Sequence, residues 1–344
     1  MRQATSRSLL VLITSAIAAC GSTGTVNQNL DASADASADA SKADASTDAV
    51  AEGAADAATD ACPPGTVPDG DGGCISLTVR RPFLIGSSMR SATTIARADW
   101  DLDLESAPVV LDDRTRAMLA EAWLRDALEE HASIAAFARL TMQMLSLGAP
   151  PDFVLASQRA GIDEIQHARA CFALAKRYGG ASAGPAPLVV SDALGATTLA
   201  EIARIAAEEG CVGETLGAAL AAEQLGRTTD AAARRVLAKI ARDETRHAEL
   251  AWGFAAWAVR EGGPAIARVF AESISRAAQA TTDAPVRSYD GIDLDQWHAH
   301  GRVTCEEARE IARRAVRDVV KPALALLSPA ILEGCEARSS SLSS

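Results

Sequence analysis

Two short segments of the sequence carry the same arrangement of an acid and an imidazole. They read Asp163-Glu-Ile-Gln-His-Ala168 and Asp243-Glu-Thr-Arg-His-Ala248, so each contains Glu-x-x-His. In a helix, residues three apart share one face, which lets one metal ion contact a carboxylate oxygen and an imidazole nitrogen from consecutive turns. One such pair is weak evidence because helices are rich in glutamate. Two matching copies predict a metal site with the candidate ligands Glu164, His167, Glu244 and His247.

The apolar residues around these motifs indicate which way the glutamates point. At about 100° per residue, Glu164 lies on a stripe with Ala160 and Cys171, and Glu244 lies on a stripe with Ile240. No basic residue of its own helix shares the azimuth of Glu164. An inward ionised carboxylate without a partner costs several kcal/mol, so it has to be protonated, paired or bound to metal.

Two further helices supply inward carboxylates. Glu130 lies on an apolar stripe that includes Trp123. On the third helix the choice is between Glu209 and Glu214, which are about 140° apart at α-helical spacing. Glu209 shares its face with Ile205, and its distance from the following turn matches that of Glu130. We therefore expect Glu209 to be the ligand and hold Glu214 in reserve.

This set of residues resembles the ligand set of the ferritin-like di-iron and di-manganese carboxylate proteins, in which two helices give one Glu each and two give Glu-x-x-His. The resemblance covers residues from about 112 to 260. It implies two iron ions, with manganese as the alternative, because the ligands are carboxylates and imidazoles without thiolate. The implied ligands are Glu130, Glu164, His167, Glu209, Glu244 and His247.

The resemblance also assigns roles around the metals. Glu164 and Glu244 would bridge the two ions, and Asp163 and Asp243 would orient the ligand histidines by hydrogen bonds. A tyrosine on the first helix near the metals, frequent in ferroxidases, is absent, which counts against an iron-storage ferritin.

A centre of this kind implies reaction with O2 or peroxide. We expect an envelope-anchored di-metal oxidoreductase of oxidase, hydroxylase or peroxidase type, with its substrate left open. The first alternative is a non-catalytic iron-binding or iron-buffering protein, which would bind metal without turnover. The second is a structural helical lipoprotein with a vestigial site, which would bind no stoichiometric metal.

The elements that position these residues follow from helical periodicity interrupted by Gly and Pro. The expected helices span about 112–147, 151–179, 198–225 and 231–262. Two tight hairpins joined by a longer crossover predict an all-α fold, a ferritin-like four-helix bundle over 111–262. Two more helices, about 265–280 and 304–327, are expected in the extension 263–344. His298 and His300 lie in the loop between them and make only a weak second metal candidate.

Composition limits the partners. The chain has 344 residues, 48% of them hydrophobic, and a formal net charge of −12. An acidic chain lacks the basic face that phosphate neutralisation needs, so nucleic acid is not an expected partner. The number of chains in the assembly is left open.

The N-terminus has the features of a bacterial export signal. Arg2 and Arg7 precede a short apolar run that ends in Ala18-Ala19-Cys20. A positive start, a short apolar stretch and a final Cys resemble a lipoprotein signal over 1–20, in which Cys20 is lipidated. This predicts a chain anchored to the cell envelope through lipid, with the outer membrane favoured because Asp does not follow Cys20.

The stretch between the signal and the helices divides in two. Residues 21–61 are mostly Asp, Ala, Ser and Thr and predict a solvated tether. Residues 62–110 begin with a turn-rich loop between Cys62 and Cys74, a candidate disulfide in an oxidising compartment. The rest of this stretch predicts an extended arm packed on the bundle.

Overall fold

The structure is a computed structural model of the chain. It describes residues 2–19, 67–68, 74–75, 81–86, 88–104, 108–280 and 289–328, with side chains described in the first of these ranges for 6–18 only. Cys20, the tether 21–61 and Cys62 lie outside the described residues, so lipidation, the tether and the disulfide stay predictions.

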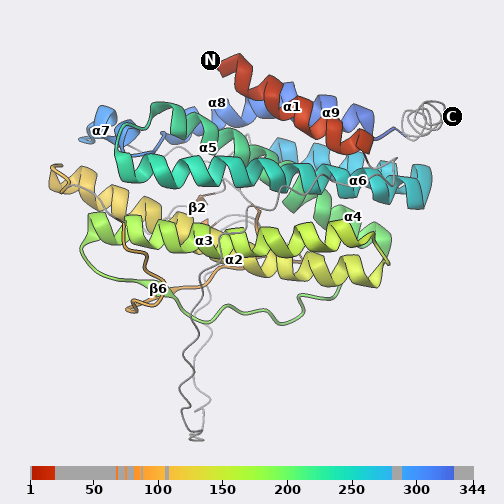
Figure 1. Ribbon diagram of the computed structural model, residues 1–344, viewed down its shortest axis with the longest axis horizontal. Coiled ribbons are helices and arrows are strands. Elements are labelled where there is room, and N and C mark those ends of the chain that lie inside the picture. Colours follow the sequence, from red (N-terminus) through yellow and green to blue (C-terminus); the bar gives the residue numbers. More distant parts are fainter. Residues whose placement is uncertain are drawn as a thin grey trace, which may run out of the picture.

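Four long helical segments form the bundle, in two antiparallel hairpins (Figure 1). They are α2 (Asp113–Ser146), α3 (Pro151–Gly179), the combined segment α4 (Leu199–Ile205), η1 (Ala206–Glu214) and α5 (Thr215–Arg227), and the start of α6 (Ala231–Ala280). The first hairpin, α2 and α3, lies beside the second, with α3 packed against α6. The predicted all-α fold built on a four-helix bundle is confirmed.

The helix ends have local causes. Asp112 accepts a hydrogen bond from the Thr115 amide at 2.9 Å and caps α2. Gly180, with φ of 80°, ends α3. Thr198 and Glu201 form a capping box at the start of α4.

The third bundle helix contains a nine-residue π-helical segment, η1, between two α-helical ones. In a π-helix the hydrogen bonds run from residue i to i+5, so residues five apart face the same side. The sequence predicted one uninterrupted α-helix here, which was wrong for this segment. The difference matters because η1 contains both Glu209 and Glu214.

The last bundle helix and the first helix of the C-terminal extension share the label α6 but are two helices. They meet at a kink at the non-helical Gly263 (φ 63°, ψ −152°), and Pro264 follows the kink. The remaining helical segments are α7 (Leu294–Ala299), α8 (Cys305–Ala315), η2 (Val316–Val320) and α9 (Lys321–Leu326). Both expected C-terminal helices are present, but the short α7 occupies part of the expected loop.

Short strands of the arm pair antiparallel with one another and with the loop between α3 and α4. The pairs are β1 (Val67–Pro68) with β2 (Cys74–Ile75), β3 (Leu84–Ile85) with β4 (Ser88–Met89), and β5 (Thr94–Ile95) with β6 (Gly184–Pro185). Phe83 of the arm is fully buried. The arm is therefore packed on the bundle as expected.

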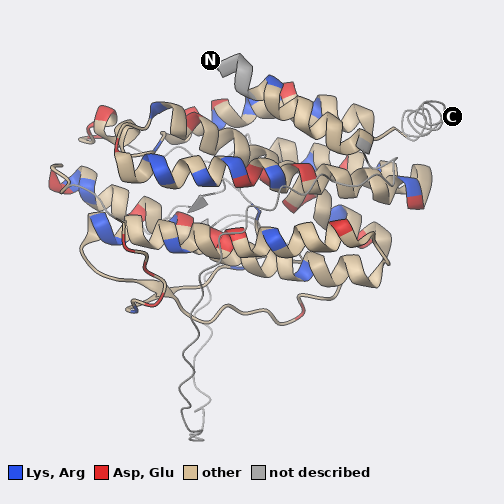
Figure 2. Ribbon diagram, in the orientation of Figure 1, with Lys and Arg blue, Asp and Glu red and all other residues tan. Residues whose placement is uncertain are grey.

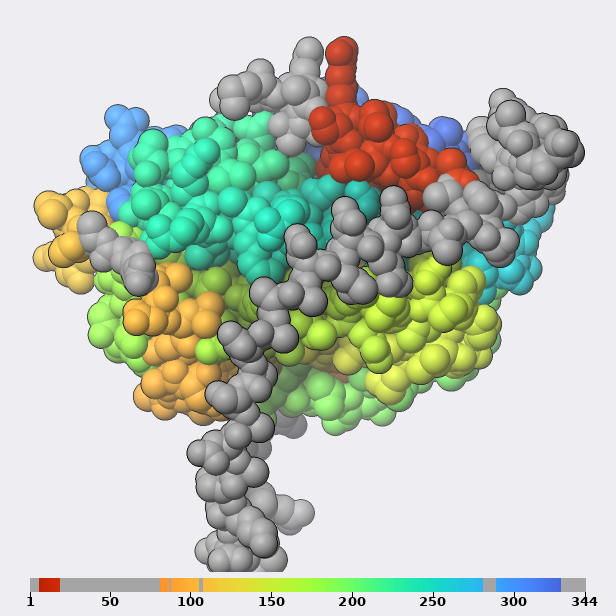
Figure 3. All heavy atoms as spheres, viewed as in Figure 1, coloured from red at the N-terminus to blue at the C-terminus, as the bar shows by residue number. Residues whose placement is uncertain are grey.

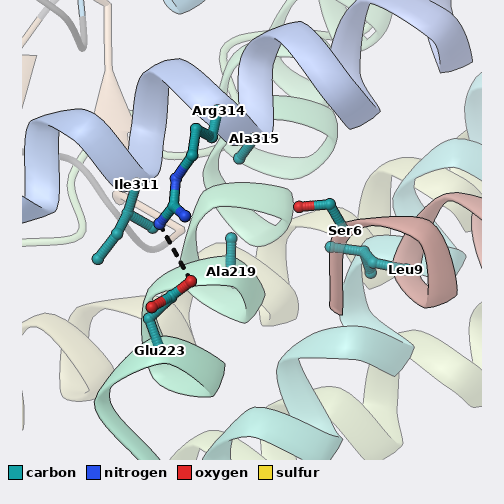
Figure 4. Close-up of a pocket in the computed structure, with 7 residues that line it drawn as sticks. All are labelled: Ser6, Leu9, Ala219, Glu223, Ile311, Arg314 and Ala315. Atoms are coloured by element: carbon teal, nitrogen blue, oxygen red, sulfur yellow. Dashed lines mark hydrogen bonds and ion pairs between the residues drawn. The ribbon is translucent and has the colours of Figure 1, made fainter. Parts of the chain in front are cut away.

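The N-terminal helix α1 (Arg2–Ala19) lies on the opposite layer, against α6, η2 and α9 (Figures 1 and 3). Leu9, Ile13 and Ile17, four residues apart, are buried in this contact. A small pocket remains where α1 meets α5 and α8, beside the ion pair between Arg314 and Glu223 (Figure 4). None of the described helices is apolar over enough length to span a bilayer.

Candidate metal centre

Six acidic and imidazole side chains from all four bundle helices meet in the interior. Each is at most 2% exposed: Glu130 from α2, Glu164 and His167 from α3, Glu214 from η1, and Glu244 and His247 from α6. They form two overlapping groups, in each of which the candidate ligand atoms lie within 4.8 Å of one another. The first comprises Glu130, Glu164, His167 and Glu244, and the second comprises Glu214, Glu244 and His247.

In the first group, the His167 imidazole lies among three carboxylates. Its Nδ1 atom lies 3.9 Å from Glu130 Oε2, 3.8 Å from Glu164 Oε2 and 3.7 Å from Glu244 Oε1. Three carboxylate oxygens lie around one nitrogen at distances longer than a hydrogen bond, which leaves a position between them suited to a cation.

The His247 imidazole has an equivalent place in the second group. Its Nδ1 atom lies 3.0 Å from Glu164 Oε1, 3.9 Å from Glu214 Oε2 and 4.0 Å from Glu244 Oε2. Glu164 and Glu244 therefore each direct one carboxylate oxygen toward His167 and the other toward His247. The two imidazole rings have centroids 6.1 Å apart.

The aspartates before the two ligand glutamates contact the histidines in a crossed pattern. Asp243 Oδ2 of α6 accepts a hydrogen bond from His167 Nε2 of α3 at 3.0 Å, and Asp163 Oδ2 of α3 lies 3.6 Å from His247 Nε2 of α6. A proton on Nε2 that points to an aspartate leaves the Nδ1 lone pair directed into the cluster.

A basic side chain ties the two aspartates together from outside. Arg246 Nη2 lies 2.9 Å from Asp163 Oδ2 and 3.0 Å from Asp243 Oδ1, and its side chain is half-exposed. Lys239 pairs with both carboxylates as well. These contacts fix the aspartates and, through them, the imidazole rings.

The chemistry of the cluster fits bound metal ions. Among the described residues, the inward atoms of the cluster that have no hydrogen-bond partner include Glu164 Oε2, Glu214 Oε2, Glu244 Oε2, His167 Nδ1 and His247 Nδ1. Buried polar atoms normally have hydrogen-bond partners, and a buried polar atom without a partner costs free energy. Carboxylates and imidazoles without thiolate suit iron or manganese, and a cation at each position would satisfy these atoms.

The electrostatics of the metal-free cluster depend on its imidazoles. Burial opposes ionisation of Glu164, but His167 and His247 outweigh it and hold the pKa of Glu164 at about 2. Burial lowers the pKa of a histidine, yet Asp243 and Glu164 raise the pKa of His167 above its usual value. Asp163 and Glu164 likewise raise the pKa of His247 well above the usual value against burial. Protons on the imidazoles thus supply the positive charge that the carboxylates need.

Glu214 differs from the other cluster glutamates in its ionisation. Burial first, and then the negative charge of Glu244, raise the pKa of Glu214 well above its usual range. A bound cation between these two carboxylates would remove that repulsion.

Glu209 is the point at which the structure departs from the expected ligand set. It lies outside both groups and pairs with Arg139 of α2 and Arg81 of the arm, and its Oε1 accepts the Leu84 amide at 3.0 Å. Glu214, held in reserve, takes the place in the cluster. The azimuths were calculated for an α-helix, whereas these two glutamates lie one π-turn apart and both point inward.

The histidines of the C-terminal loop have partners of their own. His298 Nε2 lies 2.9 Å from Glu307 Oε2, and His300 Nδ1 lies 2.9 Å from the Tyr178 hydroxyl. Neither belongs to a group of metal-ligating residues within the described part of the chain. Sequence reasoning missed Arg81 and Arg139, because nothing in the sequence signals a charge brought in from the arm.

Comparisons with known proteins give little help with identity. No family model matches the chain, and no curated protein matches it. A solved structure from Synechococcus, described as "Protein 19 with aldehyde deformylating oxidase activity", is similar over 69% of this chain and 100% of its own, with 16% identity and a TM-score of 0.40. At that identity and score, its activity does not transfer to this chain.

Proposed function

We propose that this chain is a di-iron carboxylate oxidoreductase of the cell envelope that reacts with O2 or peroxide, with manganese as the alternative metal. The observation that carries the proposal is the pair of buried ligand groups that share Glu244. Two cation positions with a common carboxylate are typical of two-metal centres in helical bundles.

The chemistry would be divided between the metals and the side chains. A pair of ferrous ions supplies electrons for the reduction of O2 or peroxide. Asp163 and Asp243 would keep a proton on the outer nitrogen of each imidazole, so that Nδ1 stays available. The surrounding bundle would exclude water, because Leu119, Phe137 and their neighbours are fully buried.

Metal analysis of the purified full chain tests the proposal. We expect two iron ions per wild-type chain, and loss of metal in Glu164→Ala and Glu244→Ala, since both side chains face both histidines. The exposed Glu261 on the same helix as Glu244 provides the control Glu261→Ala, which should keep both ions. Full metal content in both cluster variants would refute the proposal.

Mixing the anaerobic, iron-loaded chain with O2 or hydrogen peroxide separates oxidoreductase from iron buffer. An oxidoreductase should return to the ferrous form with a reductant and turn over repeatedly. If the bound iron is oxidised only once, or is not oxidised at all, the non-catalytic alternative would be favoured.

Envelope anchoring is the second part of the proposal. It is supported by the N-terminal run with Arg2 and Arg7 that ends at Cys20. Labelling cells with radioactive palmitate should label the wild-type chain and leave Cys20→Ser unlabelled, and fractionation should find the label in the outer membrane. Labelling of both chains, or of neither, would exclude a lipid at Cys20.

A further inference from the structure

The arm before the bundle carries a charged side chain into the interior, next to the metal cluster. Arg81 is 3% exposed, and its backbone carbonyl accepts a hydrogen bond from Ser133 Oγ at 2.7 Å. Its guanidinium lies over the Phe137 ring, 4.5 Å from the centroid, and the same ring lies 5.0 Å from the His247 ring. The Phe137 ring therefore contacts both Arg81 and the candidate ligand His247.

Glu214 is divided between Arg81 and the cluster. Its Oε1 accepts from Arg81 Nη1 at 3.4 Å, while its Oε2 lies 3.9 Å from His247 Nδ1 and has no hydrogen-bond partner among the described residues. A carboxylate held by one oxygen has its second oxygen fixed in direction. Here that direction is toward the second group of ligands.

Arg81 is itself held by a network that does not touch the metal positions. Arg81 Nη2 lies 3.8 Å from Glu209 Oε2, and Arg139 bonds both to Glu209 and to the Leu84 carbonyl. The guanidinium of Arg139 also lies 4.9 Å from the centre of the Phe83 ring. The buried Glu209, which is in neither ligand group, thus holds the arm against the bundle through Arg81 and the Leu84 amide.

Gly210 of η1 lies beside the Arg81 guanidinium and packs closely on α6. A Cβ at Gly210 would lie 3.4 Å from Arg81 Nη1 and 2.9 Å from the Cβ of Ala251. The guanidinium therefore lies against η1 at a point where η1 and α6 are in tight contact.

We propose that Arg81 is a positioning residue for the second cation position, which it serves by holding Glu214 with one oxygen and directing the other toward His247. The inference rests on the two-metal function proposed above. The first position does not include Glu214, so its cation should be independent of Arg81. The centre is then unequal, with one position complete within the bundle and one that depends on the arm.

Titration of the metal-free full chain with Mn²⁺ tests this, by calorimetry and by electron paramagnetic resonance. Wild type should bind two equivalents and give the spectrum of a coupled pair. Arg81→Met should bind the first equivalent as wild type does and the second about 10- to 100-fold more weakly, a usual range for the loss of a partner of a ligand. Its spectrum at one equivalent should be that of an isolated ion. Arg90→Met, an exposed residue of the same arm, is the control and should match wild type.

Arg81→Lys keeps the buried charge and guards against a folding failure of Arg81→Met. A lysine ammonium lacks the planar fork that reaches two carboxylates, so Arg81→Lys should fall between wild type and Arg81→Met for the second equivalent only. An unchanged second equivalent in the folded variants, a tighter one, or equal weakening of both would overturn the positioning role. Failure of wild type to bind two ions would instead refute the two-metal function.

Discussion

The stability of the metal-free chain should rise when the pH is lowered from 8 to about 6. The folded chain raises the pKa of His167 and of His247 above the ordinary value of 6.5, in each case because nearby carboxylates outweigh burial. Above pH 6.5 the native chain therefore holds protons that the unfolded chain has released, and this advantage disappears as the pH rises through the folded pKa values.

The size of the effect follows from proton linkage. One proton held only by the native state changes the free energy of unfolding by about 1.4 kcal/mol per pH unit. Both histidines together give about 2.7 kcal/mol per pH unit over the range in which both keep their protons. Glu164 acts in the opposite sense, since its pKa of about 2 contributes stability that is lost only as the pH falls below about 4.5 toward that value.

Urea unfolding of the chelator-treated full chain at pH 6, 7 and 8 measures this slope. Glu164→Gln removes the carboxylate that faces both imidazoles and should flatten it. The Mn²⁺-loaded chain should show the reverse trend, because protons compete with metal for the imidazole nitrogens. If the metal-free wild type loses stability, or does not change in stability, from pH 8 to pH 6, the proposed cluster of imidazoles and carboxylates would be refuted.

Five substitutions, one of them a control, test other parts of the site. Glu214→Gln should lose one of the two ions. Glu209→Gln should keep the ion of the first position, but its free energy of unfolding in urea should fall by about 3 kcal/mol, because buried guanidiniums lose their counter-charge. The opposite pattern in metal analysis would restore Glu209 as a ligand. Asp243→Asn should lower metal affinity about 10- to 100-fold in competition with a chelator, and an unchanged affinity would show that this aspartate does not orient His167. Gly210→Ala should cost about 1–3 kcal/mol, because its methyl would meet α6 at 2.9 Å. Gly226→Ala, with open space around it, should not be destabilised, and equal thermal shifts for both would contradict the close packing.

The helices of the bundle could be predicted because their signals are local. Apolar residues recur with helical period, and Pro and Gly stand at the turns, so the observed α2 and α3 differ from the expected spans by at most one residue at either end. The duplicated Glu-x-x-His motif could be read in the same way, since both residues of each pair depend on one stretch of regular helix.

The third-helix ligand could not be predicted in this way, because its position depends on an irregular backbone. The π-helical turn of η1 brings Glu209 and Glu214 to the same side, and their roles are then decided by partners far away in sequence. Arg139 lies 70 residues from Glu209, and Arg81 lies 133 residues from Glu214. Both buried glutamates have a basic partner, as the cost of burying a lone carboxylate requires. These partners are Arg139 of α2 and Arg81 of the arm, not residues of their own helix.

The distribution of charge on the surface does not indicate where the metal cluster lies. In Figure 2 the blue and red segments are interspersed along the described helices. The residues that matter for the cluster lie beneath them, and only the outer side of Arg246 and its neighbours reaches solvent. Burial, rather than surface charge, marks this centre.

The packing of α1 against α6 has a consequence for the order of events in the cell. If this helix is the export signal, the folded precursor hides Leu9, Ile13 and Ile17, the apolar side chains that a translocation machinery has to recognise. Secretion must then come before the bundle closes, and a precursor that folds early would be retained in the cytoplasm. Removal of that signal would expose the apolar surface of α6, η2 and α9 that α1 covers.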